Sequence, residues 1–224
     1  MKKIVLIYLT LFFSSTVIKA QPTSLGCWNI VNTKFNFNKS WSVLGEAQVR
    51  SFLFYSNFHY YEYKGIIAYK INKNIAVGIG IGSYQTYAEG GNFKLPKSND
   101  EVRLWPQLII TNTIGNIKIE QRCRAESRFT SNGYRNRYRY RLGLTYPFGK
   151  ATKGYQPFQL TACNELFFTN EPTYFERNRL QIAWSYKATA NTTFQIGFIN
   201  QFDYKINSQK NQTYLQTGIL IELF

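Results

Sequence analysis

The sequence predicts an all-β protein whose strands form an antiparallel barrel, and three observations lead to this prediction. After residue 20 the chain is a succession of segments about 12 residues long in which apolar and polar residues alternate. Polar turn signals separate these segments. The 18 Phe, 17 Tyr and 4 Trp exclude a disordered chain, whose signature is few aromatic residues.

The first twenty residues are predicted to be a secretory signal peptide. Lys2 and Lys3 precede an apolar run from Ile4 to Phe13, and Ala20 is a small residue suited to the last position before cleavage. We therefore expect a signal peptide at residues 1–20 and a barrel domain at residues 21–224. The exported domain is strongly basic: the whole chain has a formal net charge of +15, and the signal peptide contains three lysines and no acidic residue, which leaves +12.

Eleven alternating segments follow one another along the exported domain. They begin near Leu25, Trp41, Tyr60, Ile75, Asp100, Ile117, Tyr134, Gln156, Tyr174, Thr192 and Gln212. Single-chain bacterial barrels have an even number of strands. We therefore expect 10 strands if the segment from Leu25 is not a full strand, or 12 if another segment contains two.

The clearest alternation lies in the two segments between residues 117 and 146. The even positions of the first are Lys118, Glu120, Arg122, Arg124, Glu126 and Arg128, and its odd positions carry no charge. The second places Arg135, Arg137, Arg139 and Arg141 on one row. A helix would scatter these arginines around its axis, whereas a strand aligns them on one face. The segments from Tyr174 onward alternate in the same way.

The connections between segments are predicted to alternate between short and longer ones along the chain. Short ones lie at residues 38–39, 72–74, 115–116 and 189–191, with a longer exception at 148–155. More open ones lie at residues 55–58, 89–99, 130–133, 169–173 and 205–211. Transmembrane barrels have short periplasmic turns and longer extracellular loops, so this pattern favours a barrel in a membrane.

The distribution of aromatic residues and charges favours an outer-membrane location over a soluble one. After residue 20 no stretch approaches the roughly 20 apolar residues of a membrane helix, so a spanning chain must be a barrel. Aromatic residues gather toward the segment ends, as interfacial girdles do, and the opposite rows carry Arg and Glu. A soluble, secreted β-barrel that binds an anionic ligand is the alternative.

The charged rows are predicted to face the lumen and to form its charge network. The residues of this network are Glu46, Arg50, Glu101, Arg103, Glu120, Arg122, Arg124, Glu126, Arg128, Arg135, Arg137, Arg139, Arg141, Glu165, Arg177 and Arg179. Two interpretations remain open. The network is a ladder of cross-strand Arg–Glu pairs that fills a narrow barrel, or it is a basic constriction that attracts anions.

The arginine rows of residues 122–128 and 135–141 should lie on neighbouring strands of one hairpin. Like charges directly opposite each other are destabilising. The arrangement therefore requires glutamates such as Glu101, Glu120, Glu126 and Glu165 between the arginines, or a bound anion. Seven arginines against these four glutamates leave a residual of about three positive charges in the lumen.

Catalytic and metal sites find little support in the sequence. His59 is the single histidine, which excludes multi-histidine metal sites, and we expect no cofactor. Cys27, Cys123 and Cys163 match no zinc spacing, and the sequence cannot choose a disulfide pair among them. A lipid hydrolase would depend on His59, beside Ser56 and Asn57 at a strand edge, but a lone surface histidine is more often part of a loop.

Four motifs resemble the domain of unknown function 2490 family. They are residues Glu101–Gln107 (EVRLWPQ), Arg122–Phe129 (RCRAESRF), Arg137–Arg141 (RYRYR) and Asn164–Phe167 (NELF), and the similarity covers essentially the whole exported domain. The resemblance implies a signal-bearing barrel protein of Gram-negative outer membranes. It implies no established activity.

The sequence therefore predicts an outer-membrane β-barrel that is not an enzyme, and that is either structural, with a salt-bridged lumen, or a narrow anion-preferring channel. An outer-membrane lipid-modifying hydrolase is the alternative within the membrane. The expected partners are outer-membrane lipid, the barrel-assembly machinery and small anions. Nucleic acid is not expected, because the arginines lie in strand rows rather than in an exposed patch.

Overall fold

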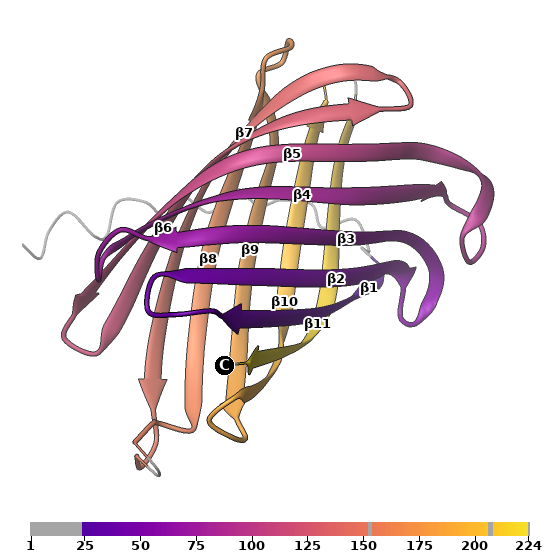
Figure 1. Cartoon of the computed structure of the whole chain (residues 1–224). Coiled ribbons are helices and arrows are strands. Elements are labelled where there is room, and N and C mark those ends of the chain that lie inside the picture. The colour runs from indigo at the N-terminus through magenta and orange to yellow at the C-terminus, as the bar shows by residue number, and fades with distance from the viewer. Residues whose placement is uncertain (1–23, 152–153, 206–207, 224) are drawn as a thin grey trace, which may run out of the picture.

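The chain forms a closed barrel of eleven β-strands in the part that the structure describes (Figure 1). The computed structural model describes residues 24–151, 154–205 and 208–223. The predicted signal peptide lies outside these residues. The strands are β1 (Leu25–Asn36), β2 (Trp41–Leu53), β3 (Ser56–Lys70), β4 (Ile75–Ala88), β5 (Lys94–Ile114), β6 (Ile117–Thr130), β7 (Gly133–Phe148), β8 (Phe158–Thr169), β9 (Phe175–Lys187), β10 (Thr192–Lys205) and β11 (Ser208–Leu223).

No helix among the described residues is long and apolar enough to cross a membrane.

The barrel closes at one parallel seam. Strands β1 to β11 pair antiparallel with their neighbours in chain order, and β1 also pairs in parallel with β11, from Leu25↔Thr213 to Phe35↔Leu223. The all-β barrel prediction is confirmed, but its strand number of 10 or 12 and its purely antiparallel closure are corrected to eleven strands and a mixed sheet. An odd number of strands brings the first and last strand together in the same direction, and a parallel ladder still pairs their backbone groups. The segment from Leu25 is therefore a full strand.

The connections do not show the expected difference in length. Three expected open loops are largely strand, because β3 begins at Ser56, β5 begins at Lys94 and β11 begins at Ser208. The longest connection spans residues 149–157, at the end where short turns were expected. In the segments that were expected to be loops, polar residues continue the strand pairing. Examples are the β10–β11 pairs Gln201↔Gln212 and Asp203↔Lys210, and they form because strand pairing uses backbone groups whatever the side chains are.

The two ends of the barrel are distinguished by the chain termini. We call C-terminal rim the end that carries the connections 37–40, 71–74, 115–116, 149–157 and 188–191 together with the end of β11, marked C in Figure 1. The opposite end, the N-terminal rim, carries the connections 54–55, 89–93, 131–132 and 170–174 and the start of β1.

Alternation along each strand separates an apolar outer surface from a polar interior. Ile79, Ile182 and Phe198 project outward and are more than half exposed, whereas Glu101 and Glu126 are 2% and 1% exposed inside the barrel. Every strand contributes at least one exposed large apolar residue to the outer surface. The charged rows therefore face the interior.

Aromatic side chains fill part of the interior beside the charges. One buried cluster joins Tyr60, Ile66, Tyr84 and Trp105. The Trp105 ring is fully buried against β4, where a Cβ at Gly80 would lie 2.3 Å from it. The absence of a side chain at Gly80 therefore leaves the space that the Trp105 indole occupies.

Candidate functional site: an arginine–glutamate network in the barrel interior

The β6–β7 hairpin places arginines directly opposite one another. The pairing of Thr130 with Gly133 at the turn sets the register of the whole hairpin. The cross-strand pairs that result are Arg122↔Arg141, Arg124↔Arg139, Glu126↔Arg137 and Arg128↔Arg135. Three of these four pairs bring like charges together, which is destabilising unless carboxylates lie between them.

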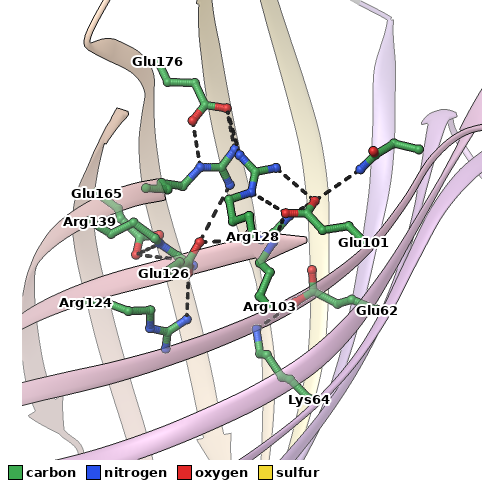
Figure 2. Close-up of polar contacts among 12 residues, drawn as sticks. Glu62, Lys64, Glu101, Arg103, Arg124, Glu126, Arg128, Arg139, Glu165 and Glu176 are labelled. Atoms are coloured by element: carbon green, nitrogen blue, oxygen red, sulfur yellow. Dashed lines mark hydrogen bonds and ion pairs between the residues drawn. The ribbon is translucent and has the colours of Figure 1, made fainter. Parts of the chain in front are cut away.

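Glu126 supplies negative charge to four arginines at once (Figure 2). Its carboxylate lies 2.5 Å from Arg139, 3.5 Å from Arg124, 3.8 Å from Arg103 and 3.9 Å from Arg137. The Glu126 side chain has no solvent exposure. A buried charge requires close pairing, and this carboxylate provides it for strands β5, β6 and β7 together.

Glu165 on β8 holds a second group of arginines. It accepts hydrogen bonds from Arg122 at 2.7 Å and from Arg139 at 2.8 Å, and its other oxygen lies 3.5 Å from Arg179. These arginines come from β6, β7 and β9. The carboxylate of Glu165 therefore links its own strand, β8, to three other strands through ion pairs.

Glu101 and Glu176 pair the arginines nearer the N-terminal rim (Figure 2). Arg103 donates two hydrogen bonds to Glu101, at 2.8 and 2.9 Å, and Arg128 binds the same carboxylate. Glu176 accepts a 2.7 Å hydrogen bond from Arg137 and lies 3.6 Å from Arg128. Together with Glu120, which pairs with Arg141 at 2.7 Å, the carboxylates pair every arginine of the hairpin except Arg135 among the described residues.

Sequence reasoning missed Glu176, because strict alternation places it on the outer row beside Arg177. The ladder between β8 and β9 shifts register between Phe167 and Phe168, and both Glu176 and Arg177 line the interior. The seven arginines of the hairpin therefore meet five carboxylates rather than the four that the sequence predicted. No pattern in the sequence marks this bulge.

The remaining predicted residues lie around the same interior but form separate pairs. Arg50 binds Glu62 at 3.1 Å, and Glu46 contacts Lys64 at 2.5 Å. Arg177 pairs with Asp203. Arg135 lines the interior near the N-terminal rim and has no ion pair among the described residues.

Two aromatic rings of the interior each contact more than one guanidinium group. The indole of Trp28 has Arg50 at 3.4 Å from its ring centroid and Arg179 at 4.6 Å. Phe167, which is 1% exposed, has four guanidinium groups within 5.6 Å of its centroid. They belong to Arg137, Arg139, Arg177 and Arg179. Stacking of this kind fixes the orientation of the guanidinium planes.

A cavity of about 1340 Å³ occupies the interior and carries an excess of positive charge. Twelve Arg or Lys residues and seven Asp or Glu residues line it. The cationic residues are Arg50, Lys64, Arg103, Arg122, Arg128, Arg135, Arg137, Arg139, Arg141, Arg177, Arg179 and Lys210, and the acidic residues are Glu46, Glu62, Glu101, Glu165, Glu171, Glu176 and Asp203. Residues of the connections at the N-terminal rim, such as Asn132 and Pro172, line the cavity, whereas none from the described connections at the C-terminal rim does.

His59 does not lie on the surface, as the sequence suggested, but faces this cavity. It is 7% exposed and stacks on Phe52 with 3.5 Å between ring centroids. Its Nδ1 has no hydrogen-bond partner among the described residues. Asn57, which the hydrolase interpretation placed beside it, instead accepts hydrogen bonds from the backbone of residues 90 and 91.

The three cysteines are free thiols, and they occupy different environments. Cys27 and Cys163 are buried, and Cys123 is exposed on the outer row. Cys163 lines the cavity. Among the described residues no group of three or more His, Cys, Asp or Glu side chains is arranged to hold a metal ion.

A closed β-barrel with an apolar outer surface and an arginine-rich, ion-paired interior is the class of protein that the fold and the site define. The chain belongs to the family described as "Protein of unknown function (DUF2490)", which matches residues 25–212. This match confirms the resemblance carried by the four sequence motifs. No curated protein and no solved structure matches the chain.

Proposed function

We propose that this protein is a transmembrane β-barrel of a Gram-negative outer membrane whose lumen attracts small anions and conducts them only through a narrow path. The opposite character of the two faces of the strands carries this proposal. The outer rows are apolar and exposed, and the inner rows surround a cavity with an excess of five positive charges. Its partners would be outer-membrane lipids, the barrel-assembly machinery and small anions.

The outer surface supports a membrane location. Soluble monomers seldom expose contiguous apolar patches larger than a few hundred Å², whereas here exposed large apolar residues encircle the barrel. Polar groups on the outer rows bind one another. Asn164 and Asn178 exchange hydrogen bonds of 3.2 and 3.3 Å, and Thr217 donates to Asn29 at 2.6 Å. Such mutual pairing is what a hydrocarbon environment demands.

The interior supports anion preference combined with a narrow path. Field lines concentrate in a cavity with low-dielectric walls, so an excess of positive lining charge raises the local concentration of anions. The ion pairs around Glu126 and Glu165 hold side chains of β5, β6, β7, β8 and β9 inside the barrel, and these side chains narrow the space that a large solute would need. A small conductance with preference for anions follows from these two features.

Cell fractionation tests the location. We expect the protein in the outer-membrane fraction, with a gel mobility that changes on heating, as folded barrels show. Recovery of a soluble periplasmic monomer without detergent would refute the membrane location and favour a soluble barrel that binds an anionic ligand.

Conductance of the refolded protein in planar bilayers tests the lumen. A salt gradient should produce a reversal potential that indicates anion preference, and replacement of Arg139 and Arg141 by Gln should reduce that preference. The matched control replaces Lys94 and Lys97, two exposed lysines outside the cavity lining, by Gln. Cation preference, a large unselective conductance or no conductance at all would each refute the anion channel. If the arginine variant alters neither selectivity nor unfolding, the arginines neither select ions nor stabilise the barrel.

A further inference from the structure

One arginine of the β6–β7 hairpin lines the cavity without a polar partner. Arg135 is only partly exposed, and it forms no hydrogen bond and no ion pair among the described residues. The other arginines of the hairpin each contact at least one carboxylate. A guanidinium carries five N–H donors and a positive charge that it does not lose. Arg135 therefore has its binding capacity available to a solute in the cavity.

Arg128 lies directly opposite Arg135 on the neighbouring strand. The register of the hairpin makes the two residues a cross-strand pair, and both side chains line the cavity. Like charges directly opposite each other destabilise a strand pair. Arg128 donates a 2.9 Å hydrogen bond to Glu101, but its Nη1 lies 3.6 Å from Glu176 and is buried without a hydrogen-bond partner among the described residues. A buried, unsatisfied donor of Arg128 therefore belongs to the same strand pair as the unpaired Arg135.

The other two like-charge pairs of the hairpin show what the Arg128–Arg135 pair lacks. In one of them a single carboxylate, that of Glu126, contacts both Arg124 and Arg139. In the other, each arginine has a glutamate of its own at 2.7 Å. In the Arg128–Arg135 pair both neighbouring carboxylates contact Arg128. Within these three pairs, Arg135 is therefore the arginine that has no counter-charge among the described residues.

Glu171 belongs to the connection beside Arg135 but does not pair with it. The backbone N–H of Asn136 donates a 2.9 Å hydrogen bond to the side chain of Asn170, so this connection lies next to the start of β7. Glu171 lines the same cavity and is exposed, and it forms no ion pair among the described residues. Its negative charge opposes the approach of an anion, and removing it provides a test.

From this arrangement we propose that Arg135 and Arg128 bind a small oxyanion, of the phosphate or carboxylate type, where the cavity meets the N-terminal rim. The inference deepens the proposed function and rests on it in one respect, which is that small anions enter the cavity from solution. The planar fork of a guanidinium matches the oxygens of phosphate and carboxylate, and hydrogen bonds between such charged groups are short and strong. Because both side chains face the interior, the ligand is a free solute rather than the headgroup of a surrounding lipid.

Equilibrium dialysis of the full-length refolded barrel against radiolabelled inorganic phosphate, and separately against radiolabelled acetate, tests this site. Potassium chloride in excess holds the ionic strength constant, so the general attraction of the basic interior is the same at every concentration of the labelled anion. We expect saturable binding of a single labelled anion per barrel, and the anion that binds more tightly identifies the type of ligand. The proposal is overturned if neither anion binds in a saturable way.

Variants at Arg135 distinguish a local site from the general charge of the cavity. Arg135→Gln breaks no ion pair among the described residues and should weaken binding by about tenfold or more, because it removes hydrogen bonds from a charged donor. The control Lys210→Gln removes one positive charge from the lining at the same rim, with β8, β9 and β10 between its strand and the hairpin. It should weaken binding by less than about threefold. Arg135→Lys keeps the charge without the planar fork and should recover only part of the affinity.

Glu171→Gln should act in the opposite direction and strengthen binding by about twofold to threefold, because it removes a negative charge from the same part of the lining. The wild-type dialysis and this variant do not depend on the folding of R135Q. Equal weakening by R135Q and K210Q, or weaker binding in E171Q, overturns the site. A barrel that conducts anions but binds neither labelled anion loses the site and keeps the proposed channel, whereas saturable binding without conductance keeps the site and refutes the channel.

Discussion

Replacing Glu126 by Gln is the strongest test of the interior network. The substitution keeps the size of the side chain and one acceptor oxygen, but it replaces the other oxygen with an NH2 donor and removes the negative charge that four arginines share within 4 Å. Among these arginines, Arg139 retains Glu165 as a partner at 2.8 Å, and Arg137 retains Glu176. Arg124 retains no carboxylate among the described residues, but keeps the uncharged Gln107, which accepts its hydrogen bond at 2.8 Å, and the Trp105 ring, whose centroid lies 4.8 Å away.

The expected cost follows from burial. The side chains of Glu126 and Arg124 are 0% and 1% exposed, so neither water nor mobile ions can replace the lost charge. Removing one partner of a buried ion pair costs about 3–5 kcal/mol, because the remaining charge stays buried without compensation. The matched substitution Glu222→Gln breaks a pair with Lys34 in which both side chains are about one-third exposed. It should cost about 0–1 kcal/mol.

Urea unfolding of the refolded barrel in lipid vesicles, followed by tryptophan fluorescence, measures both free energies. The double variant R124Q/E126Q should be more stable than E126Q alone, because it removes one of the uncompensated cations. The reasoning fails if E126Q costs no more than E222Q. It also fails if the second substitution adds to the damage, since the network would then not be held by charge balance.

Three further predictions concern the two faces of the wall and its packing. Leu142→Arg places a charge on the exposed outer row and should cost about 2–4 kcal/mol in the same titration; full tolerance would show that this row does not face lipid. In vesicles the cavity-lining thiol of Cys163 should react faster with a negatively charged methanethiosulfonate than with a positively charged one, when each rate is divided by the rate of a free thiol in solution. The exposed Cys123 on the outer row should react with a lipid-soluble maleimide. Equal relative rates at Cys163 would contradict anion enrichment. Gly80→Ala would place a Cβ 2.3 Å from the Trp105 ring and should cost about 1–3 kcal/mol, and an unchanged unfolding midpoint would mean that the indole moves freely.

The sequence alone was enough to predict the barrel and the arginine rows of the β6–β7 hairpin. Alternation with period two is a local property, and a two-residue turn at residues 131–132 determines which residues of the hairpin lie opposite each other. For the same reason the two facing arginine rows, and their need for glutamates between them, follow from the order of the residues. The approximate positions of all eleven strands follow from the same pattern.

Only the tertiary structure shows the features that depend on the closure and curvature of the barrel. The parallel seam between β1 and β11 joins the two ends of the domain, and no local pattern reports whether distant strands pair. Glu176 turns inward because of a bulge, which breaks the alternation on which the sequence prediction relied. Arg50 faces Trp28 directly across the β1–β2 pair, whereas Arg179 of β9 reaches the same ring only because the barrel curves and closes. Local periodicity determines whether a side chain points outward or into the interior. The closed barrel determines which interior side chains contact one another and which charged groups pair.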